Sequence, residues 1–369
     1  MSKRIVPYCT LLIIVFSSTL LAWLPFILSG NFQTILSHFD GPLYIIPAKT
    51  AYNPALIQEI TRDPAMPQNP LYYAAHLPLY PFFIWIVSSL GFGFTKAMLL
   101  VTVLSTVFLA WLFYTMLNRL KITNHPILLT ASILFVPRFL VLHTVGSPEP
   151  LFMLFVIASL YFFEQKKYGL AGIVGALAVS TKLPGILLFP AYMFALIESH
   201  FIHKQRIHKS ALFLLLIPIA LIAVFALYHI QFGNFFAYFN TGATVPMPYP
   251  LSVFSTSAQW VGTAWLEDVW FYIMVYVVTI ISFWNSPHRS FFYFCLVFLG
   301  GTLFVQHRDI ARYSIPLLPF AFIAFQHVLT NTQKGWHIAR VVAVIIAYAY
   351  AWNFMASNVM PITEWSPFL

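Results

Sequence analysis

The stretch IVPYCTLLIIVFSSTLLAWLPFIL (residues 5–28) decides the fold class, because it carries no charged residue and directly follows Lys3 and Arg4. A helix needs about 20 apolar residues to cross the hydrocarbon core of a bilayer. A secretory signal peptide would have a shorter apolar stretch ending in a small-residue cleavage site, and neither feature occurs here. We therefore predict that residues 5–28 form a membrane-spanning helix.

The rest of the chain has the same character. Of its 369 residues, 8% are charged, 60% are hydrophobic and 18% are aromatic, whereas about 25% of the residues in a soluble domain are charged. A surface so poor in charge suits lipid, so we predict an all-α fold, a polytopic bundle of transmembrane helices. The net charge of +9 does not indicate a nucleic-acid partner, because the basic residues are scattered between apolar runs.

Apolar runs between polar breaks predict about eleven membrane helices, at residues 5–28, 97–117, 126–143, 150–164, 168–180, 184–198, 211–230, 269–284, 291–305, 315–330 and 341–358. Cytoplasmic loops are enriched in Lys and Arg. With eleven crossings and a cytoplasmic N-terminus, the basic residues within 119–121, 166–167 and 204–209 all face the cytoplasm. A crossing by the further apolar run 77–94 would place the two later groups outside, so we predict a re-entrant or interfacial helix there.

This topology predicts one membrane domain, residues 1–369, with two long extracytoplasmic loops at residues 30–96 and 231–266. All acidic residues except Glu164 and Glu198 fall on the extracytoplasmic side, and we interpret these two as solvated loop charges beside basic neighbours. We expect a multi-pass protein of the plasma membrane in a prokaryote, or of the endoplasmic reticulum in a eukaryote.

The first loop contains the sequence His38-Phe39-Asp40-Gly41-Pro42 soon after the first helix. A carboxylate held at the outer interface can take the proton of an incoming hydroxyl group; the alternative is a loop Asp that caps a short helix. Farther along the loop, we interpret Glu59 and Asp63 as solvated surface charges and His76 as a residue that packs at an interface.

A second acid, Glu149, follows Ser147, a predicted N-cap, and Pro148 at the first helical position. The positive end of the helix dipole is a sufficient local reason for an acid here. Arg138 and His143 lie near the outer end of the preceding predicted helix, where a charge usually faces a partner or a cavity. Short connections would bring Arg138, His143 and Glu149 together, either as a functional site or as a structural Arg138–Glu149 pair.

Cations occur in two further outer turns, with Lys182 in one and Arg308, Asp309 and Arg312 in the other. Guanidinium groups suit a phosphate by charge and by bidentate geometry, and Asp309 can orient one of the arginines. The alternatives are a snorkelling lysine and an ion-paired rim without a ligand. The sequence has no metal-ligand spacing, nucleophile motif or phosphate-binding glycine loop, so we expect no metal, no cofactor and direct displacement from a phosphate leaving group.

The likeness to a known family rests on six segments: His38–Tyr44, His76–Pro81, Ser147–Phe152, Phe163–Gly185, Gln231–Tyr238 and Arg308–Pro319. On these segments the chain resembles the GT-C superfamily of lipid-phosphate-sugar-dependent glycosyltransferases. The nearest likeness is to the second mannosyltransferase of GPI-anchor assembly and its prokaryotic relatives. The chain departs from the family at Phe39, where a tryptophan often precedes the Asp, and in its short length.

The resemblance implies transfer of a hexose, with mannose the expected sugar, from a polyprenyl-phosphate donor to a lipid or glycan acceptor on the extracytoplasmic face. It implies inversion at the anomeric carbon, with Asp40 as general base and Glu149 as a second catalytic acid. The cations that would hold the donor phosphate are Lys182, Arg308 and Arg312. The supporting residues would be His38, Arg138, His143 and Asp309.

Two other classes of function stay open. A transporter or flippase of polyprenyl-linked or anionic substrates would need charges or broken helices near the membrane midplane, usually in repeated halves. The centres of the predicted helices are nearly uncharged, and the sequence shows no repeat. A non-catalytic subunit of a glycosylation complex would keep the fold but tolerate loss of Asp40 and Glu149.

Overall fold

The computed structural model describes residues 2–38, 40–63, 66–241, 246–257, 263–307 and 309–369. Across these ranges the chain is helical without strands, and one isolated bridge pairs His38 with Val359. The α-helices are α1 (Ser2–Leu28), α2 (Gln33–Leu36), α3 (Gly41–Thr50), α4 (Pro54–Ile60), α5 (Leu79–Ser89), α6 (Phe94–Arg119), α7 (Pro126–Leu134), α8 (Pro137–Leu142), α9 (Glu149–Glu164), α10 (Tyr168–Thr181), α11 (Leu188–Phe201), α12 (Leu216–Phe232), α13 (Thr263–Ser282), α14 (Arg289–Thr302), α15 (Ile310–Tyr313), α16 (Leu318–Ala324), α17 (Gln326–Leu329) and α18 (Lys334–Ser357). The 3₁₀ turns are η1 (Pro70–Ala75), η2 (Leu183–Leu187), η3 (Lys209–Leu215), η4 (Ala237–Asn240), η5 (Ser252–Phe254), η6 (Ile315–Leu317) and η7 (Ser366–Phe368).

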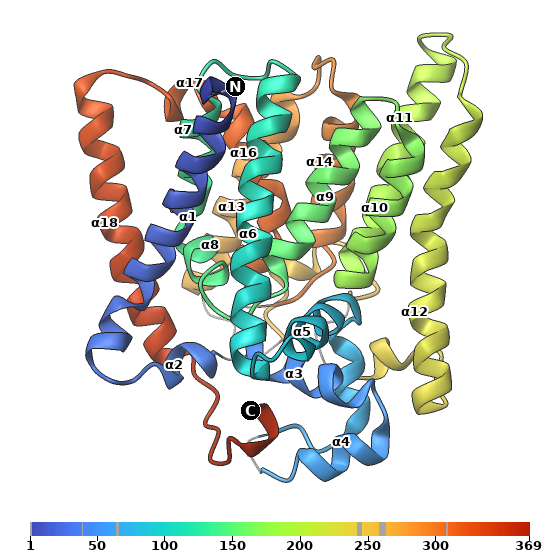
Figure 1. Ribbon diagram of the computed structural model, residues 1–369. Coiled ribbons are helices and arrows are strands. Elements are labelled where there is room, and N and C mark those ends of the chain that lie inside the picture. The colour runs from blue at the N-terminus through green and yellow to red at the C-terminus, as the bar shows by residue number, and fades with distance from the viewer. Residues whose placement is uncertain (1, 39, 64–65, 242–245, 258–262, 308) are drawn as a thin grey trace.

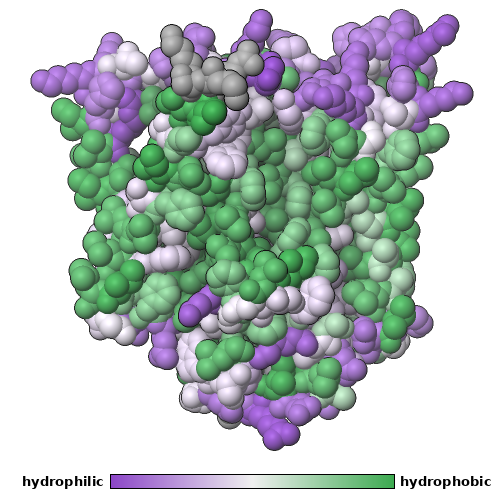
Figure 2. Space-filling view, in the orientation of Figure 1, coloured by the Kyte–Doolittle hydropathy of each residue, from purple (hydrophilic) through white to green (hydrophobic). Residues whose placement is uncertain are grey.

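The predicted α-helical membrane bundle is confirmed. Among the described residues, 5 helical stretches are long and apolar enough to cross a membrane, namely Ile5–Leu28, Phe94–Arg119, Leu183–Phe201, Lys209–Phe232 and Lys334–Ser357. The run 269–284 falls mostly within the 20-residue helix α13 (Thr263–Ser282), and the other predicted runs carry shorter or broken helices, so the number of crossings stays a prediction. On the face shown in Figure 2, a band of apolar side chains lies between two polar ends, as lipid contact requires.

Two of the membrane segments are broken by a residue in extended conformation. Val136, which precedes Pro137, has extended backbone angles and separates α7 from α8, because a residue before proline disfavours the helical conformation. Lys182 is also extended, with φ −149° and ψ 138°, and separates α10 from η2. These breaks let the chain present polar side chains at the margin of the bundle.

The bundle has two distinct ends (Figure 1). We call the end that holds the N-terminus, together with the links α6–α7, α9–α10 and α11–η3, the N-terminal end. The opposite loop end carries α2 to α5 and the C-terminus. α5 lies across this end, and its 11 residues measure about 16 Å, half of the hydrocarbon core. This length agrees with a helix that does not cross; by the positive-inside rule the loop end would be extracytoplasmic.

The last residues of the chain, 358–369, which we call the C-terminal segment, are tied to the first loop. The amide of Met360 donates to the carbonyl oxygen of Ser37, three residues before Asp40, at 2.8 Å. Asp63 accepts from the amide and hydroxyl of Thr363 at 2.8 and 2.9 Å and from the amide of Glu364 at 3.0 Å. Asp63 is only 4% exposed, so its prediction as a solvated charge was wrong.

Replacing Asp63 by alanine should release the C-terminal segment, because three donors lose their acceptor. We expect a cost of about 1–3 kcal/mol in local stability, the usual penalty for unpaired buried polar groups. Amide hydrogen exchange of residues 360–364 should rise while exchange in α6 stays unchanged. The matched control is Glu59→Ala, which removes an exposed carboxylate from the same loop; unchanged exchange in Asp63→Ala would contradict the assignment.

Glu164 and Glu198 were also predicted as solvated charges, and this too was wrong. Both side chains are mostly buried at the N-terminal end. Nδ1 of His288 lies 2.8 Å from Glu164, and Nε of Arg289 lies 2.7 Å from Glu198. The two carboxylates line a cavity of about 820 Å³. The residues that pair with them lie far from them in sequence.

Candidate active site

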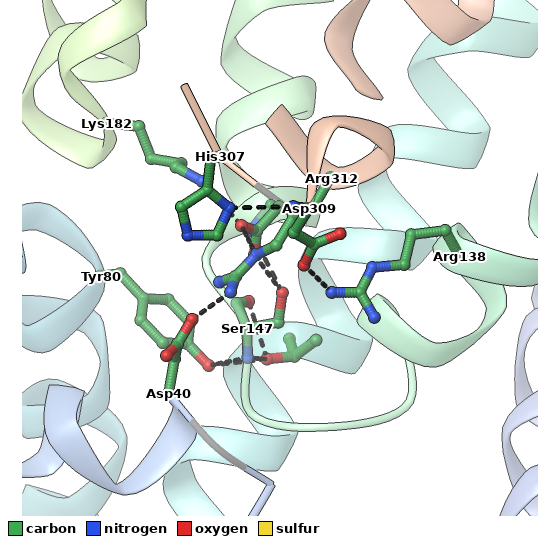
Figure 3. A network of polar contacts seen from close by, with 10 residues as sticks. Asp40, Tyr80, Arg138, Ser147, Lys182, His307, Asp309 and Arg312 are labelled. Carbon is green, nitrogen blue, oxygen red and sulfur yellow. Dashed lines mark hydrogen bonds and ion pairs between the residues drawn. The ribbon is translucent and has the colours of Figure 1, made fainter. Parts of the chain in front are cut away.

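Asp40 lies at the loop end, directly before α3, and forms an ion pair with Nη1 of Arg312 from α15 (Figure 3). Gly41 lets this turn approach the turn before α9, since a Cβ at Gly41 would lie 3.1 Å from the carbonyl oxygen of Gly146. The close approach brings Asp40 beside the turn that precedes Glu149. The Asp40 side chain is partly exposed.

Glu149 opens α9 and has every carboxylate oxygen occupied. Its Oε1 accepts from Nε of Arg312 at 2.6 Å and from Nζ of Lys182 at 2.6 Å, while Oε2 accepts from the Ser147 hydroxyl. Glu149 is 1% exposed. One buried oxygen therefore holds two cations side by side. The predicted N-cap residue Ser147 accepts from the Glu149 amide at 3.4 Å and donates its hydroxyl to the carboxylate.

The turn before Glu149 is fixed by two residues that the sequence analysis missed. The Ser147 amide lies 3.0 Å from the Tyr80 hydroxyl and 3.2 Å from Oγ1 of Thr102, and these two hydroxyl oxygens lie 2.7 Å apart. Tyr80 belongs to the His76–Pro81 segment, which was the available signal. Thr102 lies within the apolar run of α6 and gives no signal in the sequence.

Lys182 does not extend away from the protein as a snorkelling lysine would. The break after α10 turns its ammonium toward Glu149, 5.8 Å from the ring centre of Tyr313. The side chains of Lys182 and Arg312 are 19% and 16% exposed. The structure thus brings together four of the predicted site residues, Asp40, Glu149, Lys182 and Arg312, from four separate segments.

A second ion pair joins Nη2 of Arg138 to Asp309 beside this cluster (Figure 3). The alternative prediction of an Arg138–Glu149 pair is therefore wrong, because Glu149 is taken by Lys182 and Arg312. The Arg138 guanidinium stacks on Phe354 at 4.2 Å. His143 lies apart from this cluster, fully buried with Nε2 3.1 Å from the Leu134 carbonyl oxygen. Arg308 falls outside the described residues.

Burial and nearby charges together set the ionisation of Asp40, His38 and His76. Burial alone would raise the pKa of Asp40, but the Arg312 guanidinium outweighs it and holds the pKa below its usual value. Burial, assisted by the charge of Arg138, lowers the pKa of His38 to about 3. Burial lowers the pKa of His76 to about 4. At neutral pH the site therefore has an ionised aspartate and two neutral histidines.

In the described part of the chain, His, Cys, Asp and Glu side chains form no group of three that could hold a metal ion. The carboxylates of Asp40, Glu149 and Asp309 are each paired with Arg or Lys. The arrangement suits a different task, which is to hold two cations beside an ionised carboxylate.

Residues 75–229 match the family model described as dolichyl-phosphate-mannose-protein mannosyltransferase. The matched region includes Glu149 and Lys182 and leaves Asp40 and Arg312 outside. No curated protein matches the chain. Among solved structures, the oligosaccharyltransferase of Archaeoglobus fulgidus, tethered with an acceptor peptide, is similar with a TM-score of 0.49 and 13% identity. The similarity covers 95% of this chain and 56% of that one, so the chain spans little more than half of that protein.

Proposed function

We propose that this protein is a membrane glycosyltransferase that moves a hexose, mannose in our proposal, from polyprenyl phosphate to a hydroxyl group of a lipid or glycan acceptor at the loop end. The family match over residues 75–229 supports glycosyl transfer. The observation that carries the site assignment is the pair of cations, Arg312 and Lys182, held on one oxygen of Glu149 next to Asp40. The nearer likeness to the second mannosyltransferase of GPI-anchor assembly stays a prediction.

The cation pair is suited to the donor phosphate. Nη2 of Arg312 makes no hydrogen bond with the described residues, and Lys182 uses one of its three N–H groups on Glu149. Phosphate oxygens are good acceptors for these free donors. The phosphate gains negative charge as it leaves the sugar, so two fixed cations stabilise the transition state more than the bound donor.

Asp40 is the proposed general base. Its carboxylate takes the proton of the acceptor hydroxyl while that oxygen attacks the anomeric carbon of the donor sugar. The bond between this carbon and the phosphate oxygen breaks, and the bonding electrons leave with the polyprenyl phosphate. Attack from the face opposite the phosphate inverts the anomeric centre, and Asp40 later returns its proton to water.

Glu149 has a different role in this proposal from the catalytic one first expected. With both oxygens bonded and almost no exposure, it has no free lone pair that faces a substrate. Its charge keeps the ammonium of Lys182 and the guanidinium of Arg312 together despite their mutual repulsion. We therefore assign Glu149 as a positioning residue.

The pH dependence of kcat/KM and of kcat tests this arrangement. In the free enzyme Arg312 holds the pKa of Asp40, against the effect of burial, below its usual value, which for aspartate is about 3.9. A base works only when deprotonated, so kcat/KM for the donor should fall only below about pH 4. If the donor phosphate draws Arg312 from Asp40, the pKa of Asp40 rises in the complex, and kcat should fall at a higher pH than kcat/KM.

The two profiles are measured with purified protein and a labelled polyprenyl-phosphate mannose. Coincident acid limbs would mean that Arg312 stays on Asp40 when the donor binds. An acid limb of kcat/KM near about pH 6.5 would indicate a histidine base in place of Asp40.

A further inference from the structure

His76 is a buried imidazole whose ring has no hydrogen-bonding partner among the described residues. It follows η1 at the loop end and is 5% exposed. Nδ1 is buried and unpaired, and the bonds formed by this residue within the described chain use only its backbone groups. An unpaired buried polar group usually costs about 1–3 kcal/mol, so such a group calls for an explanation.

The ring has a defined position among tyrosines. The Tyr44 ring meets it edge-on with centroids 4.6 Å apart, and the rings of Tyr72 and Tyr73 lie at 5.7 and 6.1 Å. Tyr72 is half-buried, so one side of this aromatic cluster, the pocket that we propose below, reaches the surface. A hexose offers C–H faces that pack on aromatic rings and hydroxyl groups that bind donors and acceptors, and a neutral imidazole supplies one of each.

The pocket lies beside the proposed catalytic residues. The charges of Asp40, Arg312 and Lys182 all affect the pKa of His76. The charge of Asp40 also affects the pKa of Tyr72. In the proposed reaction the anomeric carbon must lie between the base and the cations that hold the phosphate. A sugar in that place would reach the pocket from the side of Asp40.

We propose that His76 binds a hydroxyl group of the sugar being transferred, in a pocket formed with Tyr44 and Tyr72. This inference rests on the proposed function and deepens it, because it makes His76 a determinant of which sugar is accepted. The phosphate stays with Arg312 and Lys182, so His76 acts on the sugar and not on the lipid phosphate.

The test compares wild type with His76→Leu on polyprenyl-phosphate mannose and on donors that each lack one hydroxyl. We expect His76→Leu to lower kcat/KM for the full donor by about 10- to 100-fold. One deoxy donor should show a loss of similar size with wild type and no further loss with the variant, since both changes remove the same hydrogen bond. Binding of sugar-free polyprenyl phosphate should be unchanged. His125→Leu, an exposed histidine at the N-terminal end, is the matched control.

If the loss caused by His76→Leu and the loss caused by the missing hydroxyl add for every deoxy donor, the proposal is overturned. His76 is then a packing residue that binds water only. If the His76→Leu protein does not accumulate in the cells that express it, His76→Gln is used in its place. The requirement is the same: for one deoxy donor, the variant must show no further loss of kcat/KM. Absence of sugar transfer by wild type would instead reject the proposed function itself. Transfer by wild type with an unaltered donor profile in His76→Leu rejects only the present inference.

Discussion

Asp40→Asn should lower kcat by about 10²–10⁴-fold, the usual contribution of a positioned general base. The amide keeps the size of the side chain but has no lone pair basic enough to take the acceptor proton. Asp40 also competes with the donor phosphate for Arg312, so the variant should bind polyprenyl phosphate at least as tightly as wild type. A loss in kcat without a loss in donor affinity separates the base from a residue that binds phosphate.

The measurement is steady-state transfer from polyprenyl-phosphate mannose, with donor affinity determined separately. Glu59→Gln serves as the control, because Glu59 is an exposed carboxylate of the same loop. Turnover like that of wild type in Asp40→Asn would remove Asp40 from the role of base. A loss confined to donor affinity would show that the residue shapes the phosphate site.

Arg312→Ala should affect both catalysis and stability. Removal of one preorganised donor to a developing negative charge costs about 10²–10³-fold in kcat, and we expect the donor KM to rise as well. The change also leaves Asp40 without its ion pair and Glu149 with Lys182 and the Ser147 hydroxyl. Breaking a buried pair costs about 3–5 kcal/mol, and the partial exposure of Arg312 reduces that figure.

The two effects are separated by measuring Tm and activity on the same preparation in detergent. Arg312→Lys keeps the charge but not the fork that reaches Asp40 and Glu149 together, so it should recover stability more than kcat. The control is Arg119→Ala, an exposed arginine at the N-terminal end. An unchanged donor KM and kcat in Arg312→Ala would exclude Arg312 from the phosphate site.

The sequence predicted the membrane bundle and which residues form the cluster. It did not predict how those residues pair with one another. Apolar runs are sufficient to place helices, and rare charges near predicted helix ends pointed to Asp40, Glu149, Lys182 and Arg312. The pairing of Glu149 could not be predicted, because it depends on the break at Lys182 and on how α9, α10 and α15 face one another. Hydrophobic periodicity predicts neither the break at Lys182 nor the relative orientation of the three helices.

Buried acids away from the site were misjudged for a related reason. Asp63 has basic and polar neighbours in sequence, yet its carboxylate accepts hydrogen bonds from residues about 300 positions later. Tyr80 and Thr102 were missed because uncharged hydroxyl groups inside apolar segments resemble ordinary helix surface. Only contacts between distant segments reveal that these two residues hold the turn before Glu149.

The central claim is most directly tested with purified protein in vesicles, supplied with polyprenyl-phosphate mannose on one side and a membrane lipid and glycan extract as acceptor. Polyprenyl-diphosphate mannose and a nucleotide mannose are the comparison donors. We predict a new glycosidic bond in the acceptor and equal amounts of free polyprenyl phosphate, from the monophosphate donor alone and only with Asp40 intact. Movement of the unchanged donor from one leaflet to the other, without cleavage of its sugar–phosphate bond, would contradict the account and identify a transporter.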